Sequence, residues 1–100
     1  MMEIKGQVII YKVPINGNLG AISPYLFIDR LADKIMETFH RVQVDKLFAS
    51  RKEIFHQVSF KLPKSYSKEQ ILLLSKQIEI IAANLLKDLE GKIYLARLAG

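Results

Sequence analysis

The residues best suited to chemistry in this sequence are the basic side chains between Arg41 and Lys68. This segment has seven lysines and arginines against two acids, while the rest of the chain has eight of each sign, so the segment carries the whole net charge of +5. Lysine and arginine neutralise phosphates, which drives sequence-independent nucleic-acid binding. The alternative is a solvated basic surface without such a ligand. The candidate nucleic-acid-binding residues are Arg41, Lys46, Arg51, Lys52, Lys61, Lys64 and Lys68.

Two histidines offer a different chemistry, because a general acid and a general base could together hydrolyse a phosphate ester. His56 shares a strand face with Val58 and Phe60, which is typical of a histidine at the edge of a core. Glu37 and His40 have the Glu-x-x-His spacing of carboxylate metal bundles, but such bundles need further copies of the motif. We therefore assign no catalytic residue and expect no metal and no cofactor.

A loop from Asn16 to Ser23 precedes the first predicted helix and is rich in asparagine and glycine. Backbone N–H groups at a helix N-terminus can hold an anion such as phosphate. The loop lacks the Gly-Lys-Ser/Thr ending of a P-loop and the spacing of a dinucleotide fingerprint. A turn-rich connection is the simpler interpretation, and anion binding here stays open.

Length and composition limit the class of protein. A chain of 100 residues, half of them hydrophobic, is predicted to form one domain over 1–100. The absence of cysteine excludes disulfides, thiolate metal sites and cysteine nucleophiles. Neither a signal-peptide stretch nor an apolar run near the roughly 18 residues of a membrane span is present. We expect a cytoplasmic protein without a membrane partner.

The hydrophobic periodicity predicts the elements that must position these residues. Alternation with a period of two predicts strands at 3–13, 54–62 and 92–99, and more weakly at 42–48, which could instead prolong the first helix. Ser23 and Pro24 mark the start of one helix. A capping box at Ser67 starts a second helix from Lys68 to about Glu90, with Gly91 at the place of a C-terminal glycine.

The resulting order of strand, helix, strand, strand, helix, strand predicts an α+β fold. Its expected form is a βαββαβ ferredoxin-like (split βαβ) sandwich, with a four-stranded antiparallel sheet and two helices on one face. A helix-rich variant without the 42–48 strand is the alternative. This fold hosts nucleic-acid binders, sensors and enzymes, so it does not define a function by itself.

Exposed apolar residues suggest self-association. The predicted strand phases place Tyr11, Phe55 and Tyr94 on the sheet face away from the helices, where they could stack on bases or contact a second copy. Leu73 and Ile80 lie one heptad apart, opposite the main apolar stripe of the second helix. These five residues are the predicted oligomer contacts.

The favoured function is a small non-enzymatic homodimeric module. A regulatory role and nucleic-acid binding through residues 41–68 both fit such a module, with DNA and RNA equally open. One alternative is a small nuclease or phosphate-ester hydrolase that uses the histidines or the Asn16 to Ser23 loop. The other is a structural or interaction subunit with no nucleic-acid role.

Overall fold

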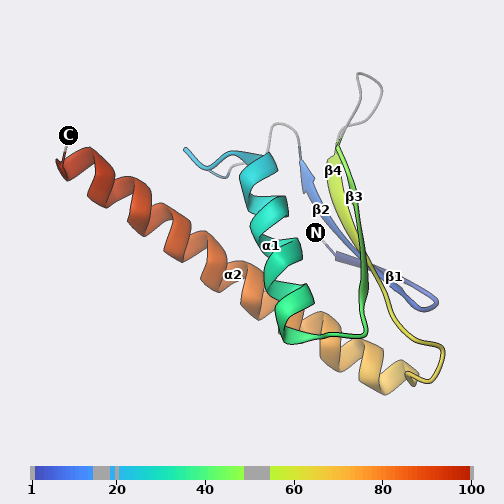
Figure 1. The fold of residues 1–100 in the computed structure, drawn as a ribbon. Helices are drawn as coiled ribbons and strands as arrows, with labels where there is room; N and C mark the ends of the chain where they lie inside the picture. The colour runs from blue at the N-terminus through green and yellow to red at the C-terminus, as the bar shows by residue number, and fades with distance from the viewer. Residues whose placement is uncertain (1, 15–18, 20, 49–54, 100) are drawn as a thin grey trace.

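The architecture is α+β, with a four-stranded antiparallel sheet and two helices, as the sequence predicts. The computed structural model describes residues 2–14, 19, 21–48 and 55–99. Both helices lie on the same side of the sheet, and the C-terminal part of the second projects well beyond it (Figure 1). The elements are β1 (Met2–Lys5), β2 (Val8–Pro14), α1 (Pro24–Thr38), β3 (Gln43–Leu47), β4 (Phe55–Lys61) and α2 (Lys68–Ala99).

The first strand expected from the sequence is a hairpin of two strands. The chain reverses at Gly6 and Gln7, so Lys5 pairs with Val8 and Met2 pairs with Tyr11. Gly6 has φ +57°, a left-handed conformation that glycine adopts at little cost. The sequence Lys5-Gly6-Gln7-Val8 lacks the Asn-Gly signature of such turns, which is why the alternation reads as one long strand.

The strand order is β1-β2-β4-β3, which does not confirm the ferredoxin-like topology. β2, α1 and β3 do form a split βαβ unit, because β4 lies between β2 and β3 and is antiparallel to both. The weaker prediction of a strand at 42–48 is confirmed by β3. The prediction of a last strand at 92–99 is wrong, since these residues continue α2, and β1 forms the edge beside β2.

The helix starts follow their capping signals. Ser23 is the N-cap of α1, with its Oγ 3.5 Å from the backbone nitrogen of Leu26. At the start of α2, Ser67 N donates to Gln70 Oε1 at 2.8 Å, and Gln70 N donates to Ser67 Oγ at 3.2 Å. This is the reciprocal capping box that the sequence predicts.

The end of α2 is not where the sequence predicts it. The helix passes Glu90 and Gly91 and ends at Ala99, because Lys92 to Ala99 contains mostly good helix formers. One glycine costs a helix about 1 kcal/mol, which is too little to stop it. The 32 residues of α2 span about 48 Å.

The core lies between the sheet and the helices. Ile9 and Val13 of β2 and Val58 and Phe60 of β4 are buried there against α1 and α2. The phase predicted for β2 is therefore wrong, since Ile9, Tyr11 and Val13 face the helices. Apolar residues occupy both faces of β2, so alternation alone could not choose between them.

Candidate nucleic-acid interface

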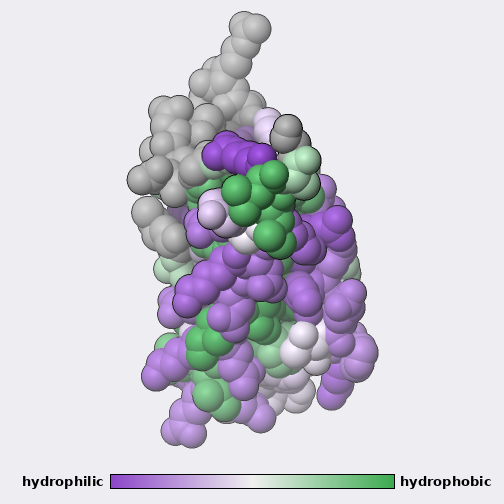
Figure 2. Space-filling model, turned by 90° about the vertical axis from the view of Figure 1, so that its left-hand side faces the viewer, coloured by the Kyte–Doolittle hydropathy of each residue, from purple (hydrophilic) through white to green (hydrophobic). Residues whose placement is uncertain are grey.

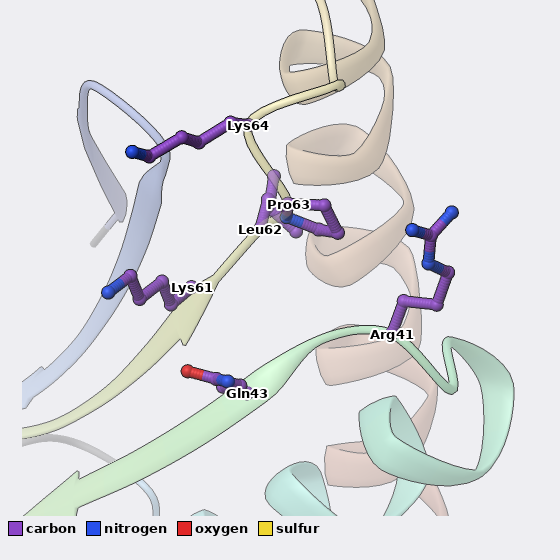
Figure 3. Close-up of a pocket in the computed structure, with 6 residues that line it drawn as sticks. All are labelled: Arg41, Gln43, Lys61, Leu62, Pro63 and Lys64. Carbon is purple, nitrogen blue, oxygen red and sulfur yellow. The ribbon is translucent and has the colours of Figure 1, made fainter.

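A hollow of about 430 Å³ lies where β4 leaves the sheet, and three cations line it. Its lining residues are Arg41, Gln43, Lys61, Leu62, Pro63 and Lys64. In Figure 3, Lys61, Lys64 and Gln43 extend to one side of the Leu62 and Pro63 backbone, and Arg41 extends to the other. We call this hollow the basic groove. Among the described residues that line it there is no carboxylate, so it favours an anion.

The strand register extends the positive charge beyond the predicted segment. Lys5, Val8, Lys61 and Gln43 form one row across all four strands, and paired residues in a sheet share a face. Lys5 therefore lies on the same open face as Lys61. Its side chain is exposed, with Nζ 3.9 Å from Glu3 Oε2. Sequence reasoning missed Lys5 because only strand pairing places it in the same row and on the same face as Lys61.

Gln7, in the β1–β2 turn, holds the wall of the basic groove in place. Its backbone oxygen accepts from Leu62 N at 2.8 Å, and its side-chain Nε2 donates to Pro63 O at 2.6 Å. Pro63 O also accepts from Tyr66 N at 3.1 Å. These bonds tie the connection between β4 and α2 to the first hairpin, so the groove has a fixed backbone frame.

The other basic candidates lie elsewhere. Lys46 Nζ is 2.8 Å from Asp29 Oδ1 on α1, and this hydrogen bond raises the pKa of Lys46 above its ordinary value. Lys68 borders a separate hollow at the start of α2. Arg51 and Lys52 lie outside the described residues. The structure thus brings Arg41, Lys61 and Lys64 together out of the seven predicted residues.

The two histidines are far apart. His56 is 4% exposed and packs among aromatic rings, with its ring centre 4.8 Å from that of Tyr25 and 5.9 Å from that of Phe48. Tyr25 is near the start of α1, while His40 follows its end, and a helix of this length spans about 22 Å. The histidines therefore cannot act as one acid–base pair here.

Glu37 and His40, which have the Glu-x-x-His spacing, do not lie on one helix. The last helical residue of α1 is Thr38, so His40 does not continue the helical spacing from Glu37. Among the described residues, no group of three or more histidines and acids could hold a metal ion. The loop from Asn16 to Ser23, for which the sequence leaves anion binding open, lies half outside the described residues, since positions 16–18 and 20 are not described.

The predicted oligomer contacts do not form one surface. Tyr11 packs on Phe27 in α1, with ring centres 5.9 Å apart, while Phe55 lies on the open sheet face, 5.6 Å from Lys12 Nζ. Tyr94 is exposed in the projecting part of α2. These three residues therefore do not form the expected aromatic surface on the open face of the sheet.

Leu73 and Ile80 are exposed on α2, at 59% and 61%. Both lie opposite the buried stripe of the helix, as its periodicity predicts. Figure 2 views the side from which α2 projects and shows separate hydrophobic patches bordered by hydrophilic side chains. Contiguous exposed apolar patches mark interaction surfaces, whereas single exposed apolar side chains are common on monomers.

Comparisons of the chain with protein-family models, with curated proteins and with solved structures found no match. Over the part of the chain that the structure describes, no helix combines the length and apolar character needed to cross a membrane.

Proposed function

We propose that this chain is a small non-enzymatic homodimeric module that binds nucleic acid through the basic groove. The observation that carries this proposal is that Arg41, Lys61 and Lys64 all line one hollow, whose described lining residues include no carboxylate. Clustered cations release counterions from a phosphate backbone, which supplies most of the free energy of sequence-independent binding.

The groove favours contacts with phosphates over contacts with bases. Its lining consists of cations, one amide, Leu62 and Pro63, without an aromatic ring on which a base could stack. Lys5 extends the same positive surface across the sheet. We therefore expect binding with a strong dependence on salt and with little sequence preference.

Fluorescence anisotropy with a labelled generic duplex and a labelled single strand, titrated between about 50 and 200 mM salt, tests this proposal. The double variant Lys61→Glu with Lys64→Glu should weaken binding more than about tenfold and make the salt dependence shallower. The matched control is Lys34→Glu with Lys92→Glu, which makes the same change in net charge on the exposed surfaces of α1 and α2.

The control variant shows whether binding depends on the basic groove or on the overall charge of the protein. Equal weakening of binding by both double variants would show that the groove is not the binding site. A wild-type protein that binds no nucleic acid at the low-salt end would favour the interaction-subunit alternative. Cleavage of the labelled strands during the titration, lost in His56→Ala with the fold intact, would favour the hydrolase.

The homodimeric part of the proposal is supported by the exposed Leu73 and Ile80. The double variant Leu73→Glu with Ile80→Lys should leave the domain folded, because neither side chain belongs to the core. Light scattering should then report half the wild-type mass. An unchanged mass would mean that this face of α2 makes no dimer contact and has a purely structural role.

A further inference from the structure

Gly91 lies within α2, and no contact or backbone angle within the chain requires a glycine at this position. Apart from its chain neighbours and the adjacent helix backbone, a Cβ built at Gly91 would meet no described atom within 4 Å, and among the described residues only Gly6 has a positive φ. Glycine in a helix interior weakens the helix relative to alanine. Gly91 thus carries a cost that neither packing nor backbone geometry within the chain explains.

The position of Gly91 on α2 suggests a reason. With about 100° per residue, Gly91 lies directly in line with Leu73, and Ile80 and Leu98 fall within about 20° of that line. Leu73, Ile80 and Leu98 are 59%, 61% and 67% exposed. We call these four residues the outer stripe. It lies opposite the buried residues of α2 and contains a notch at Gly91.

We propose that a second copy of α2 packs antiparallel along the outer stripe, with Ile80 seated over the partner's Gly91. This inference rests on the proposed homodimer and specifies its interface. Glycine lets a neighbouring helix approach closely, because no side chain stands between the two backbones.

The stripe is complementary to itself in the antiparallel sense. A two-fold axis that places Ile80 opposite Gly91 also places Leu73 opposite Leu98, since both pairs of residue numbers add to 171. Each copy thus contributes one large residue and one notch at matching positions. A parallel pair in register would instead oppose two isoleucines and two glycines, which leaves a gap at the glycines.

Charge also favours the antiparallel arrangement. Lys87 lies about 40° from the line through Leu73 and Gly91, and the same axis places it opposite Asn84. In a parallel pair in register, Lys87 would face its own copy, and like charges at a contact are unfavourable.

The contact area requires most of the helix. A face about 48 Å long and about 10 Å wide gives a total of about 1,000 Å² for the two copies, which is close to the minimum for a specific interface. The proposed axis passes near residues 85 and 86, close to the middle of Lys68–Ala99, so the two helices overlap over nearly their whole length.

The variant Gly91→Ala distinguishes an effect on the dimer interface from an effect on the stability of the monomer. Alanine should raise the melting temperature of the monomer by a few degrees, because it favours the helix. In the dimer, the added methyl group should raise the dissociation constant at least about tenfold, as measured by sedimentation. Leu73→Glu should give a monomer. The matched control Leu72→Glu should not, since Leu72 is 53% exposed but lies about 100° around the helix.

Cysteine cross-linking tests the direction, and the chain has no native cysteine to interfere. A mixture of Leu73→Cys and Leu98→Cys should form a mixed disulfide on oxidation, while either variant alone should not cross-link. Cross-linking of Leu73→Cys alone would overturn the antiparallel arrangement.

The remaining outcomes are distinguishable. If Gly91→Ala stabilises the dimer while Leu73→Glu separates it, the notch is refuted and the homodimer stands. If the wild-type protein is a monomer at all accessible concentrations, the homodimeric part of the proposed function fails as well.

Discussion

Tyr11 packs against Phe27 with ring centres 5.9 Å apart and ring planes inclined by 58°. This contact places Tyr11 between the sheet and α1, on the opposite face of the sheet from Phe55. Burial, with a smaller effect from the charge of Glu79, raises the pKa of the Tyr11 hydroxyl. Tyr11 therefore belongs with the core and not with a surface for nucleic-acid bases.

Tyr11→Ala should lower the free energy of unfolding by about 2 to 3 kcal/mol, because it removes a half-buried ring from a packed contact. Phe55→Ala, on the open face, should cost less than about 1 kcal/mol. Urea denaturation measures both. A larger loss for Phe55→Ala would contradict the sheet phase described above.

The ion pair between Glu3 and Lys12 should make stability depend on pH. Lys12 Nζ lies 3.0 Å from Glu3 Oε1, and this hydrogen bond holds the pKa of Glu3 below its ordinary value of 4.5. A lowered folded-state pKa stabilises the protein above the unfolded pKa, and this contribution is lost as the pH falls through the folded pKa.

Wild type should therefore melt above Glu3→Gln at neutral pH. The difference between the two melting temperatures should shrink below about pH 4.5. A difference that is constant from neutral to acidic pH would exclude the ionised carboxylate as its cause.

Gly6→Ala should destabilise the protein by about 1 to 2 kcal/mol, because alanine is strained at φ +57°. The added methyl group itself meets no atom within 4 Å, so the effect is conformational. Gly6→Asn should cost less, since asparagine tolerates the left-handed region better than alanine. Thermal denaturation checks this order, and equal losses for the two variants would contradict it.

Gln7→Ala should loosen the basic groove. The variant removes the hydrogen bond to Pro63 O at 2.6 Å, with an expected stability loss of about 1 to 2 kcal/mol. Hydrogen exchange should report faster exchange at Tyr66 N, which bonds the same carbonyl. If the proposed function holds, nucleic-acid affinity should fall although no charge is changed.

Lys46→Ala should behave differently from Lys61→Ala. The pair of Lys46 with Asp29 is exposed on both sides, so its loss should cost less than about 1 kcal/mol. In the anisotropy titration, Lys61→Ala should reduce the salt slope by about one, and Lys46→Ala should reduce it less. Equal reductions would indicate that binding is not confined to the groove.

The sequence by itself determined the features that depend on neighbouring residues. Helix starts at Ser23 and Ser67 are local, because the capping side chain and its backbone partner are three residues apart. The α+β class, the strand at Gln43–Leu47 and the exposure of Leu73 and Ile80 likewise follow from short periodic patterns.

Only the tertiary structure decided which strands pair and which face of β2 is buried. The turn at Gly6 divides one alternating segment into two strands. Register then places Lys5 in the same row as Lys61, with Val8 between them, and Gln7 donates to Pro63 O. The helix at 92–99 follows from local propensity instead, because these mostly exposed residues are good helix formers although their alternation suits a strand. Strand pairing, and the choice of buried face in a strand that is apolar on both faces, depend on residues distant in sequence, so the local pattern of side chains did not specify them.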